Sequence, residues 1–237
     1  MPDPTLRMSE VYLSTQGEGP RVGFPTVFVR FAGCNLRCPG WPCDTPFAIF
    51  PEQYRKEWKT FSPGQVYDDI LRVANGVTRV NVCYTGGEPF LQNYQALLEL
   101  SDLLWEKNDS PCAVVECFSN GTLVYPNWAI GTVSFIMDWK LPGSGEDPDN
   151  ENRFKNLEML TGHDVVKFTI ADRTDYQLAK NLYYEFIEPL GVPVFYGVAW
   201  GKLEPKELVA WVLEDGLDWR LNMQVHNIIW PRDQRGT

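Results

Sequence analysis

Three cysteines within ten residues carry the strongest chemical signal in this chain. Cys34, Cys38 and Cys43 lie in a predicted loop that follows an apolar stretch, Val27–Phe31. Thiolates prefer zinc, copper(I) and iron–sulfur clusters. Three thiolates this close can hold a metal cluster and still leave one metal atom without a protein ligand. Since an open metal position usually supports chemistry, the loop predicts a reactive centre.

Two other interpretations of these cysteines stay open. A structural zinc site normally has four ligands in two paired spacings, whereas this pattern is Cys-x3-Cys-x4-Cys, and His163 and His226 are far along the chain. Zinc with a remote fourth ligand is one alternative. Three unliganded thiols in a surface loop are the other, although exposed free thiols are prone to oxidation.

A second candidate segment is Tyr84-Thr85-Gly86-Gly87-Glu88-Pro89, at the end of an apolar stretch. In parallel α/β architectures, the carboxyl ends of strands carry the functional site. Paired glycines let the backbone approach a ligand closely, and Glu88 could accept a hydrogen bond from an ammonium group. An ordinary strand-to-helix turn has the same composition, so this pattern alone leaves both interpretations open.

A third segment, Ser119-Asn120-Gly121-Thr122, follows a predicted strand that ends at Phe118. Its short hydroxyl and amide side chains could bind a sugar. Taken alone, the pattern favours a simple turn, because Ser, Asn and Gly are common turn residues.

Strands alternate with helices along the rest of the chain, which predicts an α/β fold with a mostly parallel sheet. An eightfold barrel usually needs about 250 residues, so the 237 residues favour a partial, open TIM-like barrel of about six β/α units. Two segments, Phe47–Thr60 and Leu141–Arg153, are predicted to be mobile loops. The predicted strands are Thr26–Phe31, Arg79–Tyr84, Ala113–Phe118, Thr132–Asp138, Val165–Ile170, Pro193–Ala199 and Leu221–Val225, and the predicted helices are Gln65–Ala74, Tyr94–Glu106, Asp175–Ile187 and Pro205–Leu213.

The composition excludes several classes of partner. The net charge is -10, from 21 basic and 31 acidic residues, so no basic field favours binding to nucleic acid. No apolar run approaches the roughly 20 residues that span a membrane, and Met1–Arg7 does not resemble a signal peptide. We therefore expect a cytoplasmic protein whose six cysteines are reduced.

Taken together, these segments resemble the radical S-adenosylmethionine superfamily and, within it, the 7-carboxy-7-deazaguanine synthase family. The cysteine loop and Gly86-Gly87-Glu88 carry the resemblance to the superfamily. The resemblance to the synthase family rests on Gln16-Gly17-Glu18-Gly19, Cys43-Asp44-Thr45, Asp138-Trp139-Lys140, Val166-Lys167-Phe168 and the ending Gln224-Val225-His226 through Trp230–Thr237.

The chain departs from the family pattern in three places. The second cysteine gap is four residues, Pro39-Gly40-Trp41-Pro42, where the family usually has two. Asn227 follows His226 where the family often has Lys. The usual Glu-Thr-Asn-Gly-Thr sequence is replaced by Glu116–Thr122 with a different spacing. The longer gap affects the geometry of the cysteine loop more than the identity of its ligands, and the altered spacing of Glu116–Thr122 weakens the assignment of Ser119.

The resemblance implies a role for each candidate residue. Cys34, Cys38 and Cys43 bind three irons of a 4Fe-4S cluster, and the open iron binds S-adenosyl-L-methionine. The residues implied to contact this cofactor are Gly86, Gly87, Glu88, Ser119, Asn120, Asp138 and Lys140. Those implied to bind the substrate are Gln16, Glu18, Arg30, Thr85, Gln224 and His226, with Arg30 or Lys140 meeting a carboxylate. Thr45 is implied to be a ligand of Mg²⁺.

The implied reaction is that of a radical lyase in queuosine-type 7-deazapurine biosynthesis. Cleavage of S-adenosylmethionine yields a radical that removes a hydrogen atom from 6-carboxy-5,6,7,8-tetrahydropterin. The ring contracts, ammonia leaves and 7-carboxy-7-deazaguanine forms, with no catalytic side chain beyond the cofactor radical. The family also implies a flavodoxin- or ferredoxin-like reductant and a homodimer.

On this resemblance the chain is one radical S-adenosylmethionine domain, residues 1–237. Residues 1–62 are expected to form the cluster-binding part, and residues 63–237 the remaining β/α units and a C-terminal tail that binds substrate. Two functional alternatives stay open. A glycyl-radical activase would share the cysteines but has no reason for the Gln-x-His ending, and a zinc- or redox-sensing protein would bind without catalysis.

Overall fold

The computed structural model describes residues 3–232 and 234–236, and its centre is one nine-stranded sheet. The strands are β1 (Leu6–Thr15), β2 (Pro25–Phe31), β3 (Lys59–Phe61), β4 (Val80–Gly86), β5 (Cys112–Ser119), β6 (Ser134–Trp139), β7 (Val165–Ile170), β8 (Val194–Val198) and β9 (Arg220–Leu221). The α-helices are α1 (Pro46–Ile49), α2 (Pro51–Tyr54), α3 (Pro63–Ala74), α4 (Tyr94–Glu106), α5 (Glu151–Leu157), α6 (Arg173–Leu182), α7 (Pro205–Glu214) and α8 (His226–Ile229).

The sheet has the strand order β3-β1-β2-β4-β5-β6-β7-β8-β9. β2 and β4 to β9 pair in parallel, whereas β1 pairs antiparallel with both β2 and β3. The order begins at β3 and ends at β9, so the sheet stays open. This arrangement confirms the predicted α/β fold, in which β2 and β4 to β8 supply about six parallel units of a partial barrel.

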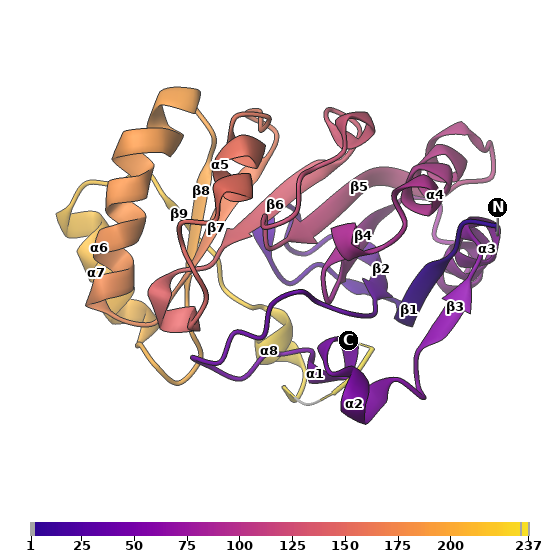
Figure 1. Cartoon of the computed structure of the whole chain (residues 1–237), viewed down its shortest axis with the longest axis horizontal. Coiled ribbons are helices and arrows are strands. Elements are labelled where there is room, and N and C mark those ends of the chain that lie inside the picture. Colours follow the sequence, from indigo (N-terminus) through magenta and orange to yellow (C-terminus); the bar gives the residue numbers. More distant parts are fainter. Residues whose placement is uncertain (1–2, 233, 237) are drawn as a thin grey trace.

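Most of the helices fall into three groups around this sheet. In Figure 1, α3 and α4 lie at one end of the molecule and α6 and α7 at the other, while α1, α2 and α8 gather at the lower centre. The short helices therefore come from the cysteine loop and from the C-terminal tail, two segments far apart in the sequence. None of the helices in residues 3–232 and 234–236 has both the length and the apolar character that a bilayer crossing requires.

Strand periodicity places apolar and polar side chains in successive layers inside the barrel. Side chains two residues apart on a strand point to the same face. Ile136 of β6 is in register with Val165 of β7, and two residues later Asp138 is in register with Lys167. Ile136 and Val165 pack with Phe195 and Phe118 into a small apolar cluster. This cluster forms a floor, and the charged pair lies one layer closer to the carboxyl ends of the strands.

Two other apolar clusters hold the fold together. The large one spans the sheet and its covering helices, including β1 to β8, and contains fully buried side chains such as Tyr67, Tyr84 and Trp139. The small one consists of Phe47, Ala48 and Ile49 of α1 and its surroundings, and Cys34 and Cys43 pack against it. The cysteine loop is therefore anchored to a separate patch of buried apolar surface.

Several predictions about individual elements were wrong. Leu6–Thr15 was not predicted as a strand, because its half-buried positions do not alternate clearly between apolar and polar residues. The predicted strand Leu221–Val225 is reduced to β9, since the chain turns at residue 222 to follow the tail. The segments Phe47–Thr60 and Leu141–Arg153, predicted as loops, contain α1, α2, β3, the 3₁₀ turn Pro142–Ser144 and the start of α5.

Candidate active site

A cavity of about 830 Å³ opens at the carboxyl ends of the strands. This volume lies within the range of about 300–1,000 Å³ that is usual for small-molecule sites. Its lining combines the strand ends with the cysteine loop and the C-terminal tail. Although the chain carries a net charge of -10, the cavity is lined by six cations against four acids. The cations are Arg30, Arg37, Lys140, Lys167, Arg232 and Arg235. The lining therefore carries more basic than acidic side chains, which favours an anionic ligand.

Cys34, Cys38 and Cys43 all line this cavity as free thiols. Leu36 N–H lies 3.4 Å and Asn120 Nδ2 3.8 Å from the sulfur of Cys34. Burial raises the pKa of Cys34 to about 12 and that of Cys38 to about 11. These thiols are thus protonated near neutral pH until a metal displaces their protons, so metal loading releases protons.

The donor set of the cysteine loop fits an iron–sulfur cluster. Three thiols can each bind a different iron of a four-iron cluster and leave the fourth iron open to a ligand. Over residues 3–232 and 234–236, no three His, Cys, Asp or Glu side chains form a ready-made site for a single metal ion.

Gly86 and Gly87 bring the end of β4 against the beginning of the cysteine loop. Gly87 N–H donates to Phe31 O at 3.0 Å, and Glu88 N–H donates to Gly33 O at 2.8 Å. A Cβ on Gly87 would lie 1.8 Å from Gly33 O, and Gly86 has a φ of 114°. Only glycine tolerates both the contact and the positive φ. This turn is therefore more than a generic connection between a strand and a helix.

Glu88 lies behind the cavity wall and is fully buried. Its carboxylate accepts hydrogen bonds from Phe90 N–H, Ser119 Oγ and Asn120 N–H at 2.8–3.1 Å. Burial raises the pKa of Glu88 to about 7, although these three donors oppose the shift. In this structure Glu88 fixes the loop that carries Ser119 and Asn120, both of which line the cavity.

Thr45 and Thr85 also lie on the cavity wall beside the cysteine loop. The Thr45 hydroxyl donates to Gly86 O at 3.3 Å and lies 3.7 Å from the sulfur of Cys43. Because a donating hydroxyl keeps its lone pairs, Thr45 could still bind a cation.

The largely buried carboxylate of Glu18, whose side chain is 13% exposed, links three parts of the chain. It pairs with Lys167 of β7 and accepts from Asn222 Nδ2 and Gln224 Nε2, each at 3.0 Å. Burial alone would raise the pKa of Glu18, but Lys167 and the other donors lower it to about 2. Glu18 is therefore ionised at neutral pH, and its charge is balanced inside the site.

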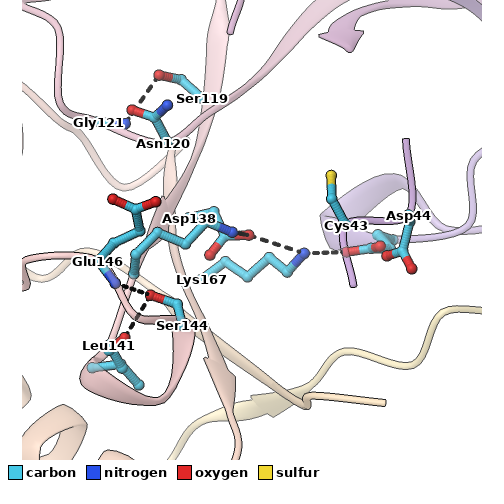
Figure 2. Close-up of polar contacts among 12 residues, drawn as sticks. Cys43, Asp44, Ser119, Asn120, Gly121, Asp138, Leu141, Ser144, Glu146 and Lys167 are labelled. Carbon is cyan, nitrogen blue, oxygen red and sulfur yellow. Dashed lines mark hydrogen bonds and ion pairs between the residues drawn. The ribbon is translucent and has the colours of Figure 1, made fainter. Parts of the chain in front are cut away.

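Asp138 and Lys140 continue this network. Asp138 lies 2.9 Å from Lys140 Nζ and 3.5 Å from Lys167 Nζ. Figure 2 shows Lys167 reaching from Asp138 towards the segment Cys43–Asp44. Asp138 Oδ1 is buried and accepts no hydrogen bond from the described residues. Since buried polar atoms are nearly always paired, this oxygen is an acceptor available to a ligand donor.

Arg30 is held in place before any ligand binds. Its Nε donates to Glu10 Oε1 and its Nη2 to the Tyr12 hydroxyl, both at 2.7 Å. The guanidinium also lies 5.7 Å from the Phe47 ring centroid. A guanidinium has five N–H donors, so Arg30 retains donors for a carboxylate while two of its bonds fix its orientation.

His226 enters the cavity at the N-terminus of α8 because Gly17 leaves room for it. A Cβ on Gly17 would lie 2.2 Å from His226 Nδ1. Val225 N–H donates to Gly17 O at 3.0 Å and fixes the same contact. Burial lowers the pKa of His226 below its usual value, so the imidazole is neutral at pH 7.

Gln16 and Gln224 occupy supporting positions. Gln16 donates to the buried Glu116 at 3.0 Å and lines the cavity. Gln224 bridges Glu18 and Asp44, at 3.0 and 3.2 Å, and lies outside the cavity lining. Asp44 also pairs with Arg232 of the tail. The tail is thereby tied to the residue that follows Cys43.

Several curated relatives that carry the same name match nearly the whole chain. The protein is 32% identical over 98% of its length to the 7-carboxy-7-deazaguanine synthase of Koribacter versatilis, which is covered completely. It is 35% identical to the synthase of Leptospira interrogans, with 96% of each chain covered. The chain belongs to the 7-carboxy-7-deazaguanine synthase family. It is therefore a radical S-adenosylmethionine enzyme that uses a 4Fe-4S cluster, as the sequence pattern predicted.

Two further comparisons agree with this family. Residues 15–124 match a family model described as a 4Fe-4S single cluster domain. The crystal structure of QueE from Escherichia coli has the same fold, with a TM-score of 0.71, 21% identity, and coverage of 94% of this chain and 95% of that chain. The open partial barrel is thus the fold found in a solved relative.

Sequence reasoning had not assigned Lys167, Asn222 or Glu10 to the site. Lys167 lies inside the apolar run Val165–Ile170, and a cation within a buried strand was the signal that could have revealed it. Asn222 accepts from Gly19 N–H at 2.7 Å while it donates to Glu18. No local pattern marks Asn222 or Glu10, because their roles depend on contacts between distant segments.

Replacing Lys167 tests the buried network. Lys167→Met should lower the free energy of unfolding by about 3–5 kcal/mol, because Glu18 then stays buried without its cation. Urea unfolding of cluster-free protein at pH 7 measures this loss. The exposed pair Lys155–Glu151 provides the control, and Lys155→Met should cost less than about 1 kcal/mol. Equal losses in the two variants would contradict the assigned role of Lys167.

The same pair predicts a pH dependence. The folded pKa of Glu18, about 2, lies below the value of 4.5 for the free side chain. The stabilising contribution of Glu18 is therefore complete above about pH 4.5 and is lost as the pH falls towards about 2. The double variant Glu18→Gln/Lys167→Met should show a flatter decrease in unfolding free energy over this range, measured by urea titrations at successive pH values.

Gly17→Ala should displace α8. The added methyl overlaps His226, so we expect a loss of about 1–3 kcal/mol in unfolding free energy. We also expect faster amide exchange over residues 225–230. Gly162→Ala is the control, because a Cβ there meets no atom within 4 Å. Unchanged exchange in the tail of Gly17→Ala would show that His226 does not depend on this glycine.

Proposed function

We propose that this protein converts 6-carboxy-5,6,7,8-tetrahydropterin to 7-carboxy-7-deazaguanine with loss of ammonia. One observation carries the proposal beyond the family name of the relatives. Segments from the two ends of the chain, Gln16–Gly19 and Gln224–His226, converge on the cavity that the three cysteines also line. This convergence supplies a binding wall for a polar planar ligand beside a radical cofactor.

We assign the cofactor side of the cavity to the residues around the cysteine loop. When bound, the 4Fe-4S cluster and S-adenosylmethionine supply the reductive radical chemistry. Gly86, Gly87 and Asn120 line this side of the cavity, and the orphan oxygen of Asp138 can accept from a hydroxyl or ammonium. Lys140 keeps Asp138 ionised.

We assign the substrate side to Gln16, Glu18, Arg30, Thr85 and His226, all of which line the cavity. The restrained guanidinium of Arg30 suits the substrate carboxylate, because it can make two parallel hydrogen bonds. Ionised Glu18 and neutral His226 suit the donors and acceptors at the edge of a pterin. Gln224 acts indirectly, because it donates hydrogen bonds to Glu18 and Asp44 and lies outside the cavity lining. Their common effect is to orient the substrate.

We also propose that Thr45 is a ligand of Mg²⁺ beside the substrate carboxylate. Support comes from its place on the cavity wall and from its free lone pairs. Mg²⁺ is usually held by one or two protein oxygens together with substrate and water.

The proposal also covers the domain organisation, the oligomeric state and the electron donor. The chain is one domain in which residues 1–62 form the cluster-binding part. Large exposed apolar side chains, such as Trp200, Ile228 and Ile229, support a homodimer. A flavodoxin- or ferredoxin-like protein supplies electrons in the cytoplasm. Family membership gives no support to a glycyl-radical activase or to a zinc- or redox-sensing protein.

Anaerobic turnover tests the proposed reaction. Reconstituted protein with S-adenosylmethionine, a reductant and the carboxytetrahydropterin should release 7-carboxy-7-deazaguanine, followed by its absorbance and mass. Cys38→Ala should abolish cleavage of S-adenosylmethionine while the fold is retained, as judged by circular dichroism. An intact cluster that yields no deazapurine would refute the proposed substrate.

Thr45→Ala tests the Mg²⁺ assignment separately. The variant should keep its iron content but lose most of the increase in turnover that Mg²⁺ produces, because the cation loses its protein ligand. Titration of turnover with Mg²⁺ measures this change. A full response to Mg²⁺ in the variant would show that Thr45 is not a ligand.

A further inference from the structure

The segment between the second and third cysteines, Pro39–Pro42, packs against a turn that is more than 100 residues away in sequence. Gly40 N–H donates to Ser144 O at 2.9 Å. A Cβ on Gly40 would lie 1.8 Å from Gly143 O, and one on Gly145 would lie 2.6 Å from Pro39 Cγ. The two extra residues therefore do not form a free bulge. They pack against the turn that follows β6, and the contact requires glycine on both sides.

Glu146 holds the same loop by its carboxylate. Its Oε1 accepts from Arg37 N–H at 2.7 Å and from Cys38 N–H at 2.6 Å. Cys38 has a φ of 45°, in the left-handed region that non-glycine residues rarely adopt. Such a conformation persists only where surrounding contacts hold it. The two hydrogen bonds to Glu146 supply that restraint at the cysteine itself.

Glu146 is in turn fixed by the body of the protein. Its own N–H donates to Ser144 Oγ at 3.2 Å, and that hydroxyl donates to Leu141 O at 2.6 Å. Figure 2 shows this chain of contacts, with the carboxylate of Glu146 directed away from Ser144. Asp175 of α6 accepts from Gly143 N–H at 2.8 Å. The turn is thus attached to α6. The Glu146 carboxylate is therefore held in position to accept hydrogen bonds from the cysteine loop.

We propose that Glu146 is the positioning residue of the cluster loop: it holds Cys38 in its left-handed conformation and adds one negative charge beside the cluster. The inference rests on the proposed function, because it assigns the place of the cluster. The potential of an iron–sulfur cluster depends on the local net charge. The charge of Glu146 therefore lowers the midpoint potential, and its hydrogen bonds fix the position of the ligand.

Two substitutions separate these roles. Glu146→Gln keeps an acceptor oxygen but removes the charge, whereas Glu146→Ala removes both. Asp149→Asn is the matched control, because Asp149 is an exposed carboxylate of the same segment. All four proteins are compared for amide exchange without the cluster, and for iron content, electron paramagnetic resonance spectrum and midpoint potential after anaerobic reconstitution.

Glu146→Ala should increase amide exchange at Arg37 and Cys38 by about tenfold or more, because two charge-assisted hydrogen bonds are lost. It should also lose most of its iron. Glu146→Gln should keep most of the exchange protection and iron, and its midpoint potential should shift to a more positive value. Asp149→Asn should match the wild-type protein in every measurement.

Unchanged exchange in Glu146→Ala would overturn the positioning role, and an unchanged potential in Glu146→Gln would overturn the electrostatic role. Gly40→Ala gives an independent test of docking. It should release the same amides while Glu146 keeps its charge, and unchanged exchange there would count against the docked loop. Failure of the proposed function is distinguishable, because the wild-type protein itself would then bind no four-iron cluster.

Discussion

The largely buried carboxylate of Glu18 is the constraint on which the site depends. A charge removed from water is tolerated only when it is paired and hydrogen-bonded. The partners of Glu18 come from β7 and from the tail: Lys167, Asn222 and Gln224. The beginning, middle and end of the chain must therefore meet at one place. Separating these three segments would leave charges without partners away from water. This cost favours a single closed arrangement of the cavity wall.

Around Glu18 the charges alternate in sign. Lys167 lies between Glu18 and Asp138, and Asp138 lies between Lys167 and Lys140. Lys167 and Asp138 each contact two charged neighbours, so these groups are oriented before a ligand arrives. Preorganised groups of this kind need little rearrangement during a reaction. The orphan oxygen of Asp138 is the one acceptor of this network that the described residues leave open.

Much of the fold could be predicted because its central strands are continuous apolar runs. β4 and β7 are buried on both faces and were predicted within two residues of their bounds. β1 could not be predicted, since it is mostly half-buried and is stabilised by pairing on both sides. α1 and α8 have four residues each, too short to form without tertiary contacts. Their positions depend on the cavity that they cover.

In the candidate site, too, residues in local motifs could be predicted, whereas residues defined by contacts between distant segments could not. Motifs revealed the cysteines and the Gly86-Gly87 turn, because their chemistry lies in adjacent residues. Lys167 belongs to a family motif, Val166-Lys167-Phe168, but the motif assigned it no role. Its register with Asp138 and its ion pair with Glu18 show that role. The wider cysteine spacing is a stronger case. Its geometry is set by Gly143 and Glu146, more than 100 residues away in sequence. Ligand spacing along a chain therefore constrains ligand position only after the surface beneath the loop is known.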